Sequence, residues 1–385
     1  MYTLLLLLIY LAFISLGLPD SLLGSAWPVI HQELQVPLSY AGAVTMIISF
    51  GTICSSLMSE RLTKKLGVNI VTVCSVLLTA IALYGFSTAS AFWMLCLWGI
   101  PYGLGAGAID AALNNYVALH YNSRHMSWLH CFWGVGTIIS PYIMSYALTT
   151  SVWQNGYRMV SFLQMGITVI LLVTLPVWKV NRKANEQKAE QAAVIGIRGA
   201  LRIKGVPQLL LGFFSYCSLE STLLLWSSNY LVGAKGVTAQ KAAAFASLFC
   251  IGITTGRFLS GLVTEKLGDY NLIRIGTGIL LLGCTSMILP LKTDAAALGG
   301  LVVMGLGCAP VYPSIIHATP DNFGAQNSQA IIGIQMASAY VGSTFMPPVF
   351  GLIANHISVA LMPFFVLFFI VLMYIMVKKT FQNRA

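Results

Sequence analysis

The sequence predicts an all-α membrane protein with twelve transmembrane helices in two pseudo-symmetric halves of six, and three observations carry this prediction. Of the 385 residues, 57% are hydrophobic and only 8% are charged, whereas a soluble domain carries about 25% charged residues. Apolar runs of roughly 20 residues, long enough to cross the hydrocarbon core as helices, recur from end to end. Finally, motifs of the first half recur in the second half at a nearly constant offset.

The twelve spans follow these apolar runs. They are expected at 3–28, 37–58, 67–89, 91–118, 127–150 and 157–179 in the first half, and at 206–232, 238–262, 270–290, 295–319, 326–353 and 356–378 in the second. The first run resembles a signal peptide in hydropathy, but it lacks a basic n-region and a small-residue cleavage site. It is therefore expected to remain as the first helix.

Basic residues are concentrated in loops that share one side of the membrane. The central stretch 179–204 holds seven Lys/Arg and two Glu, so the domains are expected at 1–179 and 206–385, joined by a basic linker at 180–205. Further basic residues follow the second span and end the chain: Arg61, Lys64, Lys65, Lys378, Lys379 and Arg384. The positive-inside rule then predicts two cytoplasmic termini. The compact chain is expected in a bacterial plasma membrane (the cell inner membrane).

The two halves repeat in three places. FGTICSSLMSERLTKKLG (50–67) aligns without gaps on IGITTGRFLSGLVTEKLG (251–268), an offset of 201. DSLL (20–23) lies over ESTL (220–223), which pairs Asp20 with Glu220, and GLG at 103–105 matches GLG at 305–307. Two parallel six-helix repeats place a substrate at their interface near the bilayer midplane.

This organisation resembles the major facilitator superfamily over nearly the whole chain. The family's loop signature between helices 2 and 3, G-x-x-x-D-R-x-G-R-K, is loosely matched by SLMSERLTKKLG, and its second-half copy reads GRFLSGLVTEKLG. The resemblance implies a gate of paired charges at the helix ends, made here by Glu60, Arg61, Arg257 and Glu265. Arg257 is accordingly expected near a cytoplasmic helix end.

Within the superfamily, GLGAGAIDAALNNYVA and SWLHCFWGVGTIISP resemble the fucose–galactose–glucose:proton symporters and their sodium-glucose relatives. Those proteins place one acidic residue in helix 1 and another in helix 4. Asp20 and Asp110 stand at the corresponding positions. The resemblance thus implies cation-coupled sugar symport.

Three acidic residues, Asp20, Asp110 and Glu220, lie inside the predicted spans, where a carboxylate costs several kcal/mol and usually marks an ion or substrate pathway. Asp20, Gly24 and Trp27 share one face of a continuous helix, an arrangement that suits a sugar. The alternative is an acid that pairs with a neighbouring helix while Trp27 anchors at the membrane interface.

Asp110 and Asn114 lie one turn apart in the fourth span, and with Asp20 they are the predicted ion-coupling residues. A buried carboxyl could bind and release a proton, whereas Asp110 and Asn114 could equally present oxygens to Na⁺; a purely structural pairing is the other reading. His130 could relay protons, although a solvated or capping histidine is the plainer reading.

The predicted substrate-binding residues are Asp20, Trp27, Asn114, Glu220, Ser227, Gln335 and Tyr312. Ser227 lies seven residues after Glu220 on the same helix face. Gln335 and Tyr312 lie on polar stripes of the eleventh and tenth spans, which suit either a cavity wall or tight helix packing.

These features predict a secondary active transporter, a symporter of a neutral sugar such as a hexose driven by H⁺ or Na⁺, working by alternating access. No Lys or Arg is expected at a helix centre, which argues against anionic substrates. The alternative is a proton-coupled efflux antiporter of drugs or metabolites, although the motif G-x-x-x-G-P-x-x-G-G of such exporters is not matched by GVGTIISPYIMS.

An enzyme is not expected, because the sequence lacks a phosphate loop, an HExxH motif and a redox cysteine pair. The eight cysteines have no metal-ligand spacing, so no cofactor or resident metal is expected beyond the coupling ion. The net charge of +10 is explained by the basic loops rather than by nucleic acid. The expected partners are a small-molecule substrate and the lipid bilayer, around a monomer.

Overall fold

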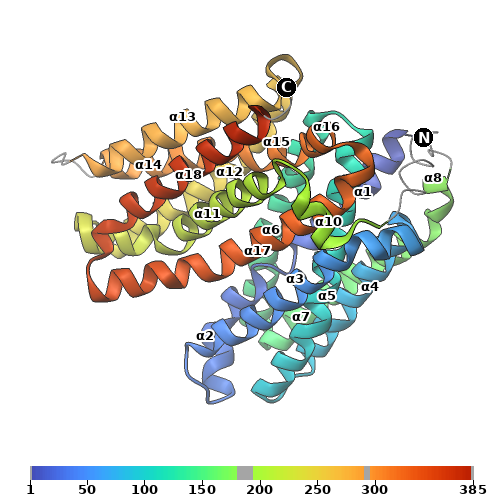
Figure 1. Cartoon of the computed structure of the whole chain (residues 1–385). Coiled ribbons are helices and arrows are strands. Elements are labelled where there is room, and N and C mark those ends of the chain that lie inside the picture. Colours follow the sequence, from blue (N-terminus) through green and yellow to red (C-terminus); the bar gives the residue numbers. More distant parts are fainter. Residues whose placement is uncertain (1, 180–193, 290–294, 383–385) are drawn as a thin grey trace. The chain divides into compact units, whose positions relative to one another are not determined.

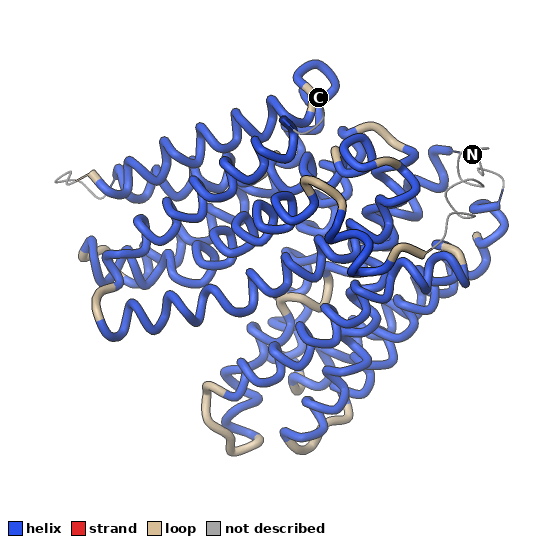
Figure 2. The backbone as a smooth tube through the Cα atoms, in the orientation of Figure 1, coloured by secondary structure: helices blue, strands red, loops and turns tan. Residues whose placement is uncertain are grey.

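The computed structural model describes residues 2–179, 194–289 and 295–382, and these residues form helices and short connections without a strand (Figure 2). Eleven helical segments of this described part are long and apolar enough to cross a membrane. The all-α membrane fold is therefore confirmed. The first part of the predicted linker, 180–193, lies outside the described residues.

The helices of the first half are labelled in Figure 1. They are α1 (Tyr2–Gly17), α2 (Leu22–Glu33), α3 (Tyr40–Leu66), α4 (Val68–Ser87), α5 (Phe92–His120), α6 (Ser123–Thr150), α7 (Trp153–Val173) and the short α8 (Leu175–Lys179). The first predicted span, expected as one helix, is wrong in this respect, because it is divided into α1 and α2 by a turn at residues 18–21.

The second half begins with the short α10 (Gly196–Arg202) and continues through longer helices. These are α11 (Val206–Lys235), α12 (Ala239–Leu267), α13 (Asp269–Ile288), α14 (Ala295–Cys308), α15 (Val311–His317), α16 (Thr319–Phe323), α17 (Ala325–His356), the 3₁₀ turn η1 (Val359–Leu361) and α18 (Met362–Gln382). The eighth predicted span corresponds to α12, some of whose side chains lie outside the described residues.

The chain forms two compact units, which are described separately. Unit 1 comprises Met1–Tyr116, Leu129–Gly196 and Ala325–Ala337, and unit 2 comprises Val117–Trp128, Ile197–Gly324 and Ser338–Ala385. In unit 1, α4 packs along α7, and in unit 2 the closest pairs are α13 with α14 and α11 with α18. Unit 1 therefore contains most of α6 and the start of α17, and unit 2 contains the start of α6.

The sequence repeat is reproduced in backbone geometry. Gly67 and Gly268, aligned at the offset of 201, end α3 and α12 with φ 84°, ψ 152° and φ 76°, ψ 157°. An L-residue rarely adopts these positive φ angles, which explains glycine at both turns. A Cβ on Gly103 would lie 2.1 Å from the Ile48 carbonyl oxygen, and one on Gly305 would lie 2.5 Å from that of Phe249. The predicted equivalence of these glycines is confirmed.

Helices α1 and α6 approach each other through two glycines. A Cβ on Gly17 would lie 2.1 Å from the carbonyl oxygen of Trp133, and a Cβ on Gly136 would lie 2.3 Å from that of Ile14. Small residues permit this spacing between membrane helices, where van der Waals contact drives association. This contact fixes the position of the residues that follow α1.

We expect Gly136→Ala to destabilise unit 1, because the new methyl group must displace the backbone of α1 rather than a flexible side chain. The expected loss is about 1–3 kcal/mol, as for overpacking in a rigid core. Gly166→Ala in α7 is the control, since a Cβ there meets nothing within 4 Å. Thermal unfolding in detergent micelles measures both variants, and equal midpoints would contradict the expectation.

Candidate functional site

The break between α1 and α2 has a local cause. Pro19 has no N–H and therefore cannot donate to the carbonyl of Ser15, as a residue of a continuous helix would. The Asp20 N–H instead bonds to the Gly17 carbonyl at 3.2 Å, which closes a tighter turn. The break thus places Asp20 on a turn in the middle of the apolar segment Thr3–Glu33.

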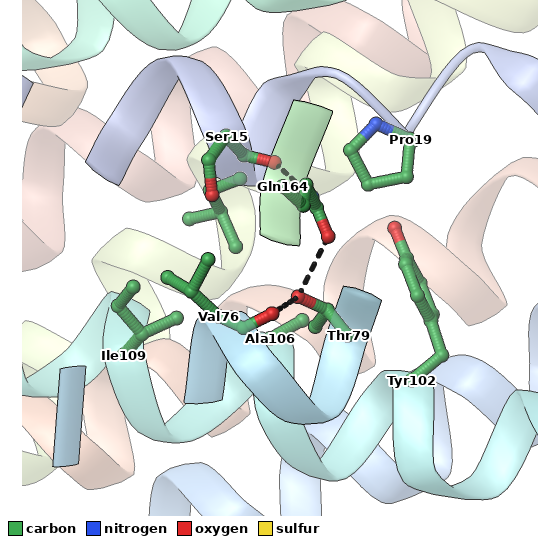
Figure 3. Close-up of a pocket in the computed structure, with 9 residues that line it drawn as sticks. Ser15, Pro19, Val76, Thr79, Tyr102, Ala106, Ile109 and Gln164 are labelled. Carbon is green, nitrogen blue, oxygen red and sulfur yellow. Dashed lines mark hydrogen bonds between the residues drawn. The ribbon is translucent and has the colours of Figure 1, made fainter. Parts of the chain in front are cut away.

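The Ser15 carbonyl, which receives no helical hydrogen bond from Pro19, accepts one from another helix instead. Gln164 of α7, which is fully buried, donates from Nε2 to the Ser15 carbonyl at 2.6 Å. Its Oε1 accepts from the Thr79 hydroxyl of α4 at 3.0 Å. Figure 3 shows Gln164 between Ser15 and Thr79, with Pro19 and Tyr102 around the same small pocket. Side chains of α4 and α7 therefore stabilise the break between α1 and α2.

The Asp20 carboxylate receives hydrogen bonds from two aromatic side chains. The Tyr102 hydroxyl of α5 donates to Oδ1 at 3.0 Å, and the Trp133 indole of α6 donates from Nε1 to Oδ2 at 2.9 Å. Asp20 itself is nevertheless exposed. Because each oxygen has a further lone pair, the carboxylate can still accept hydrogen bonds from a bound molecule.

Trp27 does not accompany Asp20 as predicted. It is only 4% exposed, donates from Nε1 to the Leu38 carbonyl at 2.7 Å and packs edge-on against Phe92. The prediction assumed one continuous helix, and the break removes the shared face. Trp133 supplies the indole beside Asp20 instead.

Asp110 is buried on α5, 4% exposed, and is the first member of a hydrogen-bonded chain. Asn114 donates from Nδ2 to the Asp110 carboxylate Oδ1 at 2.8 Å and lies 3.0 Å from the Asp110 backbone oxygen. Its Oδ1 lies 3.0 Å from Nε2 of the buried His130 on α6. His130, for which the sequence favoured a solvated or capping role, is thus an internal residue.

This arrangement bears on the predicted Na⁺ site. Asn114 turns its amide nitrogen, not its oxygen, toward Asp110. A cation that takes an oxygen from both residues would require the amide to rotate, which would turn its NH₂ group toward His130.

Glu220 lies in unit 2 and is paired with arginine. The Arg257 guanidinium of α12 contacts Glu220 Oε1 at 3.3 Å, and it lies 5.9 Å from the ring centre of Tyr312. Arg257 is 3% exposed and stands ten residues before Leu267, where α12 ends. Its predicted position near a helix end is therefore wrong, as is the expectation that no arginine lies at a helix centre. Glu220 also differs from Asp20 in lying within an unbroken helix, α11.

The remaining predicted substrate residues are placed as follows. The Ser227 hydroxyl donates to the Leu223 carbonyl of its own helix at 2.5 Å and is buried. Tyr312 of α15 packs against Phe213 and Tyr216, which ties it to Arg257 and Glu220 in unit 2. Gln335 of α17 is fully buried in unit 1. The structure thus brings Tyr312 and Glu220 together and leaves Ser227 in a local backbone bond.

The predicted gating residues Glu60 and Glu265 do not form one cluster of paired charges but have different partners. Glu60 is buried and accepts from the backbone N–H groups of Ile195 and Gly196, each at 3.1 Å, and from Lys64 at 3.0 Å. Glu265 forms an ion pair at 2.9 Å with Arg124 at the start of α6. Arg61 is exposed. Glu60 thus binds the backbone at the start of α10, whereas Glu265 pairs with a side chain of α6 within unit 2.

Sequence reasoning did not identify Tyr102, Trp133 or Arg124 as partners of the acids. Their contacts join α1 with α5 and α6, and α6 with α12, so nothing in local sequence spacing reports them. A usable signal was Pro19 beside Asp20, since a proline in an apolar run frees a carbonyl and breaks a helix.

A bundle of membrane-length helices with hydrogen-bonded carboxylates inside its spans defines a membrane transport protein. The chain belongs to the Major Facilitator Superfamily, whose family model matches residues 9–328. The family explains the all-helical fold and makes the protein a transporter rather than an enzyme.

Individual relatives are distant. The yeast "Bypass of stop codon protein 6" (Saccharomyces cerevisiae) is 22% identical over 91% of this chain and 77% of its own length. A probable nitrate/nitrite antiporter of Thermus thermophilus, NarK1, is 23% identical over 86% and 81%. Among solved structures, a variant of the E. coli fucose:proton symporter FucP has a TM-score of 0.76 at 17% identity over 100% and 99%. The proton:xylose symporter XylE has a TM-score of 0.80 at 12% identity over 97% and 94%.

Proposed function

We propose that this protein is a proton-coupled symporter that carries a neutral sugar, such as a hexose, by alternating access. The observation that carries the proposal is the exposed Asp20 carboxylate at the break of the first span, flanked by Tyr102 and Trp133. A carboxylate accepts hydrogen bonds from sugar hydroxyls, and an aromatic face covers the apolar side of a pyranose ring. Two sugar:proton symporters of the same fold support this reading.

A neutral substrate fits the charges of the two units. Arg257, the buried arginine of α12, is already paired with Glu220. A substrate anion would have to displace that carboxylate at the cost of leaving it buried without its partner. A polyhydroxylated neutral molecule needs no such exchange.

The proposed coupling group is Asp110. It is buried, and one of its hydrogen-bond partners is the Asn114 amide, which donates to the carboxylate. Asp20, exposed and held by two donors, is assigned to the substrate instead. Proton coupling is preferred to sodium because Asn114 presents nitrogen to Asp110.

Proton-coupled efflux is the second candidate, and the Glu220–Arg257 pair is the observation that favours it. A carboxylate such as Glu220 can either take up a proton or pair with a cationic substrate in place of Arg257, and an antiporter requires this alternation of proton and substrate at one site. The direction of proton movement separates the two functions, because symport brings protons in with the solute and antiport moves them against it.

The test is uptake of labelled hexoses into proteoliposomes with an imposed pH or Na⁺ gradient. We expect a pH gradient to drive accumulation by the wild-type protein. Asp110→Asn should lower accumulation at least about tenfold, because it cannot take up the coupling proton, while exchange of labelled for unlabelled sugar continues. Asp321→Asn, an exposed acid of α16, is the control.

Each alternative gives a distinct result. Accumulation driven by Na⁺ alone would mean that the coupling ion is Na⁺ rather than H⁺, and the proposal of a sugar substrate would stand. Absence of uptake for every hexose under both gradients would reject the sugar proposal, and efflux of organic cations or anions would then be measured with the same vesicles.

A further inference from the structure

The amide of Asn114 is held in one orientation by three helices of unit 1. Nδ2 faces two oxygens of Asp110, the carboxylate Oδ1 at 2.8 Å and the backbone oxygen at 3.0 Å. It also lies 3.9 Å from the Met336 sulfur of α17. While the Asp110 carboxyl is charged, both of these oxygens accept, so the NH₂ group faces them and the oxygen of the amide points to His130.

The orientation of Asn114 also fixes the proton on His130. Asn114 Oδ1 accepts only, so His130 Nε2, 3.0 Å away, must carry the hydrogen. The Phe13 ring of α1 lies edge-on to the imidazole, with ring centres 5.5 Å apart. His130 thus contacts α1 through its ring and α5 through its Nε2.

Two other described acids of unit 1, Asp20 and Glu60, have hydrogen-bond partners of their own. The Asp20 carboxylate, seven residues after Phe13, accepts from Tyr102 and Trp133. On α3, which packs on α5, Glu60 accepts from Lys64 and from backbone N–H groups, and Arg61 is exposed. The part of α17 in unit 1 has no ionisable side chain. Asp110 is thus the titratable group to which His130 is linked by hydrogen bonds through Asn114.

We propose that His130 is a positioning residue for proton coupling, which holds the Asn114 amide so that its NH₂ group, rather than its oxygen, faces the Asp110 carboxylate. The inference rests on the proposed role of Asp110. With the hydrogen from His130 in place, Asn114 donates to Asp110 and favours the charged carboxylate. Without it, the amide is held by Asp110 alone, so when the carboxyl takes up a proton the amide can rotate, accept from that proton through its oxygen and favour the protonated form.

The test separates a hydrogen-bond donor from a space-filling side chain. His130→Leu removes the donor, whereas His130→Gln keeps an N–H donor near the position of Nε2 but cannot itself titrate. Phe13→Leu is the packing control, because it alters the contact with the ring and leaves the hydrogen-bonded chain in place. If the leucine variant does not fold, His130→Met is the second donorless variant.

The readout is the infrared carbonyl band of the protonated Asp110 carboxyl, assigned by its loss in Asp110→Asn and followed against pH in lipid. We expect the titration midpoint to move by about one pH unit to higher pH in His130→Leu. His130→Gln and Phe13→Leu should keep the wild-type midpoint. Thermal unfolding of each variant confirms that the titrated protein is folded.

An unchanged midpoint in a folded donorless variant, or the same shift in His130→Gln as in His130→Leu, would overturn the inference. The absence of a titrating Asp110 band would do so as well. The infrared measurement needs no substrate. A shift without any hexose uptake would therefore keep the inference and reject sugar transport, and uptake without a shift would do the reverse.

Discussion

Removing either member of the Glu220–Arg257 pair should destabilise the protein by about 3–5 kcal/mol, and removing both should restore most of the loss. Arg257 is 3% exposed, and its partner carboxylate, Glu220, lies 3.3 Å away with a side chain 14% exposed, so a single substitution leaves a largely buried charge without its main counter-ion. Replacing both by methionine removes the two charges together and keeps most of the side-chain volume, and a swap of this kind is often neutral.

The measurement is the free energy of unfolding in micelles for Glu220→Met, Arg257→Met and the double variant. The Arg124–Glu265 pair supplies the control, since its side chains are 36% and 41% exposed and an exposed pair contributes only about 0–1 kcal/mol. Single variants of Glu220 and Arg257 that unfold like the control variants would show that the buried pair has little effect on stability.

The fold was predictable because its signals are local or repeated. Apolar runs of membrane length mark the helices, and the aligned glycines Gly67 and Gly268 mark equivalent turns whose positive φ angles no other residue adopts easily. The division of the first span into α1 and α2 was not predicted, although Pro19 in the apolar run indicated a break in the helix. Hydropathy measures only the apolar character of a segment and is insensitive to a turn of four residues.

The candidate site was predictable only in part. The sequence identified Asp20, Asp110 and Glu220, because a carboxylate inside an apolar run is costly wherever it lies. Their partners could not be read from spacing, since Trp133 reaches Asp20 from α6 and Arg257 reaches Glu220 from α12. Arg257 was assigned to a helix end because it lies within the loop motif GRFLSGLVTEKLG, but α12 continues for ten residues beyond it, so Arg257 lies about 15 Å from the end of the helix.

Asp20→Asn should weaken binding of the proposed sugar about 100-fold, because charge-assisted hydrogen bonds to the substrate are lost. Asparagine matches the shape of aspartate but offers one acceptor oxygen and one NH₂ group. Tyr102 and Trp133 both donate to residue 20, so the NH₂ group must face one of these donors. The substitution therefore disturbs the site twice, by removing the charge and by placing an NH₂ group where one of the two donors had an acceptor.

Glu33→Gln is a matched control, because Glu33 also accepts an indole N–H, from Trp153 at 2.8 Å, together with a second donor, Gln154 at 3.1 Å. It stands at the end of α2 rather than at the break of the first span. Binding of labelled hexose by equilibrium dialysis, without an ion gradient, should fall in Asp20→Asn and remain in Glu33→Gln. Equal loss in both variants would mean that any indole–carboxylate contact supports the fold, and Asp20 would then lose its assignment to the substrate.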